Sequence, residues 1–232
     1  MQDAIIISDL HLGSDTCQVE LIKAFLDDIE DGTLATRELI LNGDVFESHD
    51  FRRLSKCHWK ILGRLRKMSN HMNITWLAGN HDGTAESMST LLGIAFKEEH
   101  MLLSGPKKVL CLHGHIYDDF LTDHPILTLM GDWIYYVLQK LDPSFGIARR
   151  AKKSSKTFVR CIEKVQKLAL AHARKIHADV VCCGHTHMEA EVPGEVSYYN
   201  SGCWTERPCT FLQIADGSVR LHRYNGRHSS CL

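Results

Sequence analysis

Five short hydrophobic segments, each ending in polar side chains that can bind a ligand, constrain the fold of this chain most. They occupy residues 5–11, 39–44, 74–82, 109–115 and 180–187. The first four polar endings, at Asp9, Asp44, Asn80 and His113, follow one another at intervals of 35, 36 and 33 residues. Such intervals are typical of strand–crossover–strand units of about 30 residues or more, so the spacing predicts an α/β fold. The last interval, from His113 to His185, is 72 residues and indicates an insertion.

The polar endings follow apolar runs that we interpret as buried strands. Ligands bind beyond the carboxyl ends of the strands in open α/β sheets, so we expect these side chains to converge. Asp44 follows Gly43, which lets the backbone pass close by, and is our candidate for the central metal ligand. The full set of candidate metal ligands is Asp9, His11, Asp44, Asn80, His113, His185 and His187.

The chemistry of this set favours a pair of divalent cations. Carboxylate and imidazole without cysteine suit manganese, iron or zinc, of which we expect manganese first. Seven ligands are too many for one tetrahedral ion and suffice for two ions that share Asp44. Two such ions can clamp a phosphate and promote in-line displacement at phosphorus. The alternative, a coincidence of core polar residues, would leave each buried group with a desolvation cost.

Composition excludes few classes of protein. The 232 residues can form one domain with a small appendage, and a net charge of −1 gives no general bias toward nucleic acid or anionic membranes. We therefore expect no nucleic-acid partner. Nine cysteines without C-x-x-C spacing indicate reduced thiols in a cytosol. No basic segment precedes the first apolar run and no run reaches about 18 apolar residues, so we expect a cytoplasmic protein.

Periodicity gives a coarse order of elements. Apolar residues at helical spacing predict helices over 19–29 and 51–68, and a short helix over 84–93. Residues 99–103 and 108–112 indicate a hairpin, which implies a mixed sheet. Alternating segments at 197–200, 210–214 and 219–224 predict antiparallel strands near the end of the chain. Cys182 and Cys183, adjacent on a strand, should point to opposite faces.

The insertion predicts a helical cap on this core. We assign residues 1–115 and 176–232 to the core and residues 116–175 to the cap, with helices over 126–141 and from Phe158 to Ile176. Between residues 149 and 175 there are ten Lys or Arg against one acidic residue, Glu163. This basic run beside Trp133 and Phe145 could hold acyl chains and dock peripherally on an anionic membrane, at the inner membrane face. Equally, it could be a helical hairpin with a solvated basic face.

Taken together, the motifs resemble the calcineurin-like metallophosphoesterases over the whole chain outside the insertion. They are Asp9-x-His11, Gly43-Asp44, Gly79-Asn80-His81-Asp82, His113-Gly114-His115 and Gly184-His185-Thr186-His187. The resemblance implies a four-layer α/β/β/α sandwich with a dinuclear site. One metal would take Asp9, His11, Asp44 and His187, and the other would take Asp44, Asn80, His113 and His185. His81 would protonate the leaving oxygen or stabilise the transition state, and Asp82 would orient its ring.

Within that superfamily the chain is similar to the UDP-2,3-diacylglucosamine hydrolases of lipid A synthesis. The likeness lies in residues 8–13, in residues 43–47, in the helical insertion and in residues 200–204. It implies hydrolysis of a pyrophosphate that releases UMP and a lipid monophosphate. The chain departs from that pattern at His81, where the group has Arg, and at His115, where it has Asp.

Three functions are therefore compared. The first is a metal-dependent hydrolase of a phosphoanhydride or phosphodiester, with a membrane-associated UDP-sugar lipid as the favoured substrate. The second keeps the chemistry but acts on a soluble nucleotide or another small phosphate ester, which suits His81 better. The third is a non-catalytic scaffold like the retromer-type proteins of the same fold. Those scaffolds usually lack parts of the ligand set, and here every position is filled.

Overall fold

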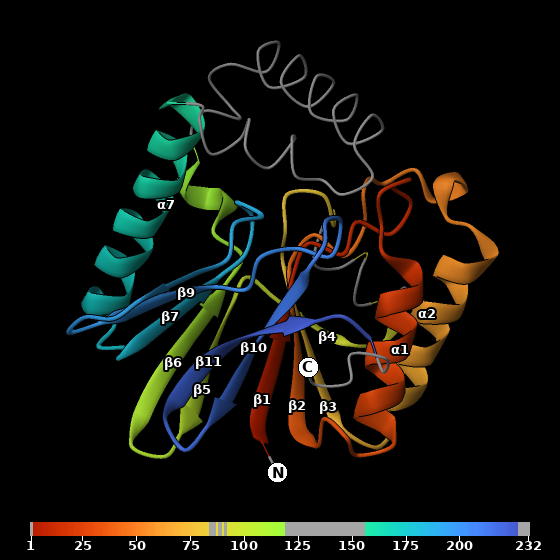
Figure 1. Ribbon diagram of the computed structural model, residues 1–232, viewed down its shortest axis with the longest axis horizontal. Coiled ribbons are helices and arrows are strands. Elements are labelled where there is room, and N and C mark those ends of the chain that lie inside the picture. The colour runs from red at the N-terminus through yellow and green to blue at the C-terminus, as the bar shows by residue number, and fades with distance from the viewer. Residues whose placement is uncertain (1, 84–86, 88–89, 91, 119–155, 227–232) are drawn as a thin grey trace.

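A computed structural model describes residues 2–83, 87, 90, 92–118 and 156–226, and shows two stacked sheets with helices on both outer faces (Figure 1). The larger sheet has the strand order β11-β10-β1-β2-β3-β4, and the smaller has the order β5-β6-β7-β9-β8. The strands of the first sheet are β1 (Gln2–Ile7), β2 (Thr36–Asn42), β3 (Asn73–Leu77), β4 (Ala95–Lys97), β10 (Cys209–Ala215) and β11 (Ser218–Tyr224). Those of the second are β5 (Glu99–Ser104), β6 (Lys107–Leu112), β7 (Val180–Cys183), β8 (Ala190–Val192) and β9 (Ser197–Asn200).

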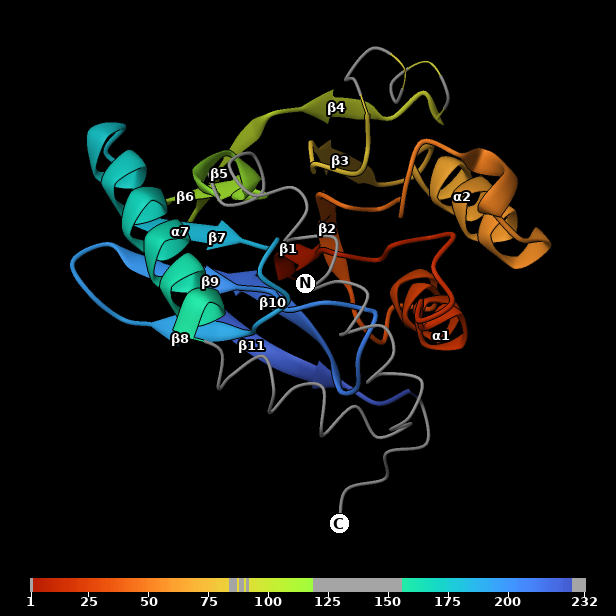
Figure 2. The same ribbon diagram turned by 90° about the horizontal axis from the view of Figure 1, so that it is seen from above.

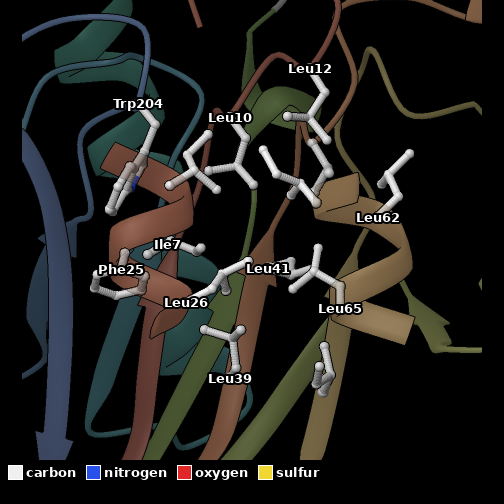
Figure 3. Close-up of a cluster of buried hydrophobic side chains, with 14 of the residues drawn as sticks. Ile7, Leu10, Leu12, Phe25, Leu26, Leu39, Leu41, Leu62, Leu65 and Trp204 are labelled. Atoms are coloured by element: carbon white, nitrogen blue, oxygen red, sulfur yellow. The ribbon is translucent and has the colours of Figure 1, made fainter. Parts of the chain in front are cut away.

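Alternation along β1 shows how one strand serves two cores. Side chains on a strand point to opposite faces in turn. Ile5 and Ile7 join the cluster beneath α1 (Val19–Glu30) and α2 (Lys56–Met68), whereas Ala4 and Ile6 join the cluster between the sheets. In Figure 3, the first of these clusters fills the space between the two helices and the sheet. Its labelled members are Ile7, Leu10, Leu12, Phe25, Leu26, Leu39, Leu41, Leu62, Leu65 and Trp204.

The second sheet carries the fourth layer on its outer face. Helix α7 (Lys156–Lys175) buries Ala169 and Ala173 in a cluster with Val181 and Cys183, and Figure 2 shows it on the side away from α1 and α2. Cys182 belongs instead to the cluster between the sheets, so the two adjacent cysteines point to opposite faces as predicted. The expected four-layer sandwich is therefore confirmed.

Several predicted elements are confirmed with shifted ends. The first helix and the β5–β6 hairpin lie where expected, while the second helix begins only after Ser55, whose hydroxyl caps it. A short 3-10 helix, η1 (Phe51–Arg53), fills the start of that predicted range. Ser87, Thr90 and Leu92 are helical within the predicted helix 84–93, whose other residues are only partly described. The predicted helix 126–141 and the cap residues 119–155 lie outside the described residues.

One strand differs from its expected pairing. The sequence predicts β9 as an antiparallel partner of the two strands that follow it, but it lies in the other sheet and pairs parallel with β7. Its antiparallel neighbour is β8, a strand that the pattern did not predict. Strands β10 and β11 do form the expected antiparallel pair.

The topology gathers the strand ends that carry the motifs. Strands β1, β2 and β3 are parallel neighbours in one sheet, and β6 and β7 are parallel neighbours in the other. Their carboxyl ends lie at the same end of the sandwich in Figure 1. The described residues include no helix long and apolar enough to cross a lipid bilayer.

Candidate metal centre

The backbone at the strand ends adopts an unusual conformation. Five of the seven predicted ligands have a positive φ although none is glycine: Asp9 (55°), His11 (47°), Asp44 (51°), His185 (66°) and His187 (56°). Left-handed backbone is uncommon for such residues and costs about 1–3 kcal/mol each, and it persists where the surrounding structure enforces it. The concentration of this strain at one place is the pattern found at functional sites.

The first group of side chains comes from the ends of β1 and β7. Nε2 of His187 lies 3.1 Å from Oδ1 of Asp9 and 3.1 Å from Nε2 of His11. Nε2 of His11 lies 4.0 Å from Oδ1 of Asp9. One carboxylate oxygen and two imidazole nitrogens thus face a common point, as the ligands of one metal ion do.

The second group lies beside the first, and Asp44 is the residue nearest to both. Asp44, His113 and His185 have potential ligand atoms within 4.8 Å of one another. Oδ2 of Asp44 lies 3.2 Å from Nε2 of His113 and 3.9 Å from Nε2 of His11. A single oxygen atom therefore lies between the imidazoles of the two groups, where a bridging ligand would be.

Two glycines allow these motifs to pack so closely. A Cβ atom on Gly43, whose φ is +85°, would lie 2.4 Å from the ring of His113. A Cβ atom on Gly184 would lie 2.7 Å from Oδ2 of Asp9. The glycine of each motif thus lets its backbone touch a candidate ligand of another motif, which explains why the Gly-Asp and Gly-His pairs carry glycine.

The charged groups at this centre shift one another's pKa values. Burial disfavours the charged form of His113, but Asp44 and Asp9 outweigh it and raise the pKa of His113 to about 9. Burial likewise opposes charge on His187, and Asp9 raises its pKa to about 10. Burial would raise the pKa of Asp44, yet His113 and His11 hold it well below its usual value. Buried carboxylates here require positive charge beside them, from protons or from a cation.

The residues present fit divalent cations. Among the described residues, Oδ1 of Asp9 and Nε2 of His113 are buried and have no hydrogen-bond partner of proper geometry. Leaving a buried acceptor or imidazole nitrogen unpaired costs free energy, and coordination would remove that cost. Oxygen and imidazole ligands without a thiolate suit manganese, iron or zinc.

Asn80 is the remaining predicted ligand, and it offers an amide oxygen in place of a carboxylate or an imidazole. It follows β3 with an exposed side chain, next to His81, whose backbone N–H donates to Oδ1 of Asp44 at 2.9 Å. The structure therefore places the Asn80 backbone beside the centre, and its role as a ligand stays a prediction.

The structure corrects the expected relation between His81 and Asp82. Nδ1–H of His81 donates to the backbone oxygen of Glu47 at 2.7 Å, so Glu47 rather than Asp82 orients the ring. The carboxylate of Asp82 instead accepts hydrogen bonds from the Phe46 N–H at 3.0 Å, the Trp76 indole at 3.0 Å and the Gly79 N–H at 3.2 Å. Its role is to hold together the two loops that carry Asp44 and Asn80. Burial and the charge of Asp44 raise the pKa of Asp82 to about 6.

The hydrogen-bond acceptors that orient the candidate imidazole ligands were not identified from the sequence. Oε2 of Glu47 accepts a hydrogen bond from Nδ1 of His11 at 2.9 Å. The backbone oxygen of Asn42 accepts one from Nδ1 of His113 at 2.8 Å. Glu47 follows Asp44 by three residues, and that proximity was the only available signal for it. A carbonyl oxygen such as that of Asn42 leaves no trace in a sequence.

Further polar residues lie close to two of the candidate ligands. His187 forms a compact group with the buried Cys203 and Glu206, and burial raises the pKa of Glu206 to about 7. His115 lies with its ring centroid 5.5 Å from that of His113, and burial together with that neighbour lowers its pKa to about 4. His115 is therefore neutral at physiological pH.

Comparisons with known proteins find a matching family model and solved structures of similar fold. Residues 4–189 match the family model described as calcineurin-like phosphoesterase. The phosphoesterase Yfce from E. coli has a similar structure, with a TM-score of 0.51 and 18% identity over 96% of this chain and 99% of its own. Vps29 from Chaetomium thermophilum aligns with a TM-score of 0.49 and 12% identity, over 96% of this chain and 98% of its own. Among curated proteins, none matches the sequence significantly.

Proposed function

This chain belongs to the calcineurin-like phosphoesterase family, and from that premise we propose that it hydrolyses a phosphoanhydride or phosphodiester at a centre of two divalent cations. As a member of the family, it is a metal-dependent phosphoester hydrolase. The observation that carries the dinuclear proposal is the position of Oδ2 of Asp44, 3.9 Å from the imidazole of His11 and 3.2 Å from that of His113.

The proposed ligands divide between the two groups. Asp9, His11, Asp44 and His187 would hold one cation, and Asp44, Asn80, His113 and His185 would hold the other. We expect manganese in both positions, with iron or zinc as alternatives. When bound, the two cations supply positive charge to the phosphoryl oxygens and lower the pKa of water.

His81 is the proposed proton donor to the leaving oxygen. Its Nδ1–H is held by the backbone oxygen of Glu47, so Nε2 is the nitrogen left to face a substrate. Its ring lies edge-on to that of His11, with centroids 5.1 Å apart, which places it at the margin of the first group. Proton transfer from a side chain in such a position contributes about 100- to 10,000-fold to hydrolysis.

We favour a UDP-2,3-diacylglucosamine-type lipid as the substrate, with UMP as one product. The support is the likeness of residues 8–13, 43–47 and 200–204 to the enzymes that cleave it. In addition, Ile116 and Val159 expose apolar side chains, 58% and 37% respectively, and the short 3-10 helix η2 (His115–Tyr117) that carries Ile116 packs against α7. Exposed apolar side chains on these two packed elements suit a substrate with acyl chains.

A soluble nucleotide or small phosphate ester is the second candidate. The observation in its favour is His81, which stands where the lipid hydrolases have a permanently charged Arg. An imidazole donates a proton readily, whereas a guanidinium binds a phosphate without giving up its proton. Turnover of small nucleotides with kcat/KM equal to that of the lipid would favour this candidate.

The experiment that tests the proposal uses manganese-loaded protein. It should hydrolyse bis-p-nitrophenyl phosphate and release UMP from UDP-2,3-diacylglucosamine, with a higher kcat/KM for the lipid than for UDP-N-acetylglucosamine. Asp44→Asn should abolish both reactions. Asp31→Asn is the matched control, since Asp31 is exposed after α1, at the opposite end of the sheet. An Asp44→Asn variant as active as the control would refute the proposal.

Peripheral membrane association is proposed for the basic segment. The described part of it, α7, exposes Arg160, Lys164, Lys167, Arg174 and Lys175. Basic residues near a surface attract anionic lipid by about 1 kcal/mol each at physiological ionic strength. The protein should sediment with phosphatidylserine vesicles at low salt, and less at high salt or with phosphatidylcholine vesicles alone. Equal sedimentation with both lipids would contradict it.

A further inference from the structure

Two imidazoles of the candidate centre donate a hydrogen bond from the ring nitrogen that faces away from the centre. His11 donates from Nδ1 to Glu47, and His113 donates from Nδ1 to the backbone oxygen of Asn42. In both rings the remaining nitrogen, Nε2, faces Asp44. An outer acceptor of this kind fixes the tautomer and the orientation of a metal-binding imidazole.

His185 also has an acceptor partner, but the hydrogen bond is made by Nε2 and not by Nδ1. Nε2 of His185 lies 2.9 Å from Oδ2 of Asp118, and both side chains are more than nine-tenths buried. A carboxylate can only accept from the imidazole, so Nε2 carries the hydrogen and Nδ1 is left to face Asp44 and His113. The backbone N–H of His185 donates to Oδ2 of Asp9 at 3.1 Å, which fixes the residue from the other side.

Asp118 is itself held by the helix that forms the outer layer. Its Oδ2 also accepts the thiol of Cys161 on α7 at 3.1 Å. The preceding residue, Tyr117, is joined to His172 on the same helix by a hydrogen bond of 2.7 Å. The turn that carries Asp118 thus has two hydrogen bonds to α7. The carboxylate of Asp118 joins one of them, from Cys161, to the candidate ligand His185.

We propose that Asp118 is a positioning residue that holds His185 in the tautomer that binds the second cation through Nδ1. This inference rests on the proposed dinuclear centre, and it adds to that centre a residue from the start of the insertion. Asp118 accepts a hydrogen bond from the ring of His185 as Glu47 does from the ring of His11. Its hydrogen bond with Cys161 links His185 to α7.

Loss of the Asp118 carboxylate should affect the binding of only one of the two cations. Without the carboxylate, the His185 ring can rotate and carry its hydrogen on either nitrogen, so the second cation should bind more weakly. Loss of such an outer acceptor lowers metal affinity by about 10- to 100-fold. The first cation should be unaffected, because His11 keeps Glu47 and His187 keeps Asp9. Asp118→Asn should restore most of the affinity, since the amide oxygen still accepts from Nε2–H.

The test is a calorimetric titration of the metal-free protein with manganese, on the wild type and three variants. Asp118→Ala should weaken the second binding step and leave the first unchanged, while Asp118→Asn stays near the wild type. Tyr117→Phe is the matched control, because it removes a contact with α7 from the same turn and does not touch His185. Thermal unfolding in EDTA checks that each variant is folded.

A spectroscopic measurement tests the tautomer without metal. In nitrogen-15 NMR spectra of the metal-free wild type, with the signals assigned by a His185→Gln variant, His185 should carry its hydrogen on Nε2. Asp118→Ala should lose that preference and Asp118→Asn should keep it. Unchanged second-step affinity in Asp118→Ala, or an equal loss in Tyr117→Phe, would overturn the inference alone. A wild type that binds fewer than two cations would overturn the proposed function and the inference with it.

Discussion

Gly79 lies directly against Asp44, so that a Cβ atom on Gly79 would be 2.2 Å from both the backbone nitrogen and Oδ1 of Asp44. The loop after β3 therefore fits over the central carboxylate only because residue 79 has no side chain. Gly79→Ala should displace Asp44 and destabilise the protein by about 1–3 kcal/mol, the usual cost of overpacking. Loss of bound manganese should accompany the fall in unfolding free energy, measured by denaturant titration and metal analysis.

Gly63→Ala is the control for this substitution. Gly63 lies within α2, and a Cβ atom there would meet nothing within 4 Å. Alanine is the better helix former, so this variant should gain about 0.5–1 kcal/mol and keep its metal. If Gly79→Ala matched Gly63→Ala in both measurements, the close packing of Gly79 on Asp44 would not hold.

Asp82 should matter for stability more than for chemistry. Asp82→Ala leaves three buried donors, at Phe46, Trp76 and Gly79, without their acceptor. We expect a loss of about 2–5 kcal/mol in unfolding free energy, because each unsatisfied buried group costs roughly 1–3 kcal/mol before relaxation. Asp82→Asn retains one acceptor oxygen and should lose less. Equal stability of the alanine variant and the wild type would contradict this role.

Removal of His81 should slow hydrolysis without removing metal. His81→Ala should lower kcat by about 100- to 10,000-fold for a substrate with a poor leaving group, such as an alkyl ester. The loss should be much smaller for bis-p-nitrophenyl phosphate, whose leaving group needs little protonation. Metal analysis should show the same manganese content as in the wild type. A kcat that falls equally for both substrates would exclude His81 as the proton donor.

The folded and unfolded states should differ in their protonation of Glu206. Burial raises its pKa from 4.5 to about 7 in the folded protein. The folded state therefore holds this proton more tightly, so the contribution of Glu206 to stability falls as the pH rises from 4.5 to 7, and the cost persists above pH 7. In EDTA, Glu206→Gln should stabilise the protein at pH 8 by up to about 3 kcal/mol and have little effect at pH 4.5.

Glu195→Gln serves as the comparison for this pH dependence. Glu195 is exposed in the turn between β8 and β9, so its substitution should change the unfolding temperature little at either pH. If Glu206→Gln showed no greater stabilisation at pH 8 than at pH 4.5, the burial cost assigned to this carboxyl would be wrong.

The sequence was most informative where chemistry and periodicity coincide. Alternation placed Cys182 and Cys183 on opposite faces, and the strand-end motifs predicted that Asp9, Asp44 and His185 would approach one another. These predictions succeeded because a buried strand must be apolar and because its polar ending is fixed by the strand. Periodicity does not detect strands without fully buried residues. It therefore missed β4 and β8, which are three residues long and have none.

Individual hydrogen-bond partners from distant segments could not be predicted from the sequence. Asp82 was assigned to its neighbour His81, whereas its carboxylate accepts from Phe46, 36 residues away. Asp118 meets His185 across 67 residues and forms no local motif with it. Which side chain meets which is decided by the packing of the two sheets, and a single sequence does not encode that as a pattern.

That Asp44 bridges two cations is tested most directly by anomalous diffraction from crystals of the manganese-loaded protein. Two peaks are expected, one beside Asp9, His11 and His187 and the other beside His113 and His185, with Asp44 contacting both. Crystals of Asp44→Asn grown in the same way should show neither peak at full occupancy. A single peak in the wild type, or manganese bound away from Asp44, would contradict the dinuclear centre.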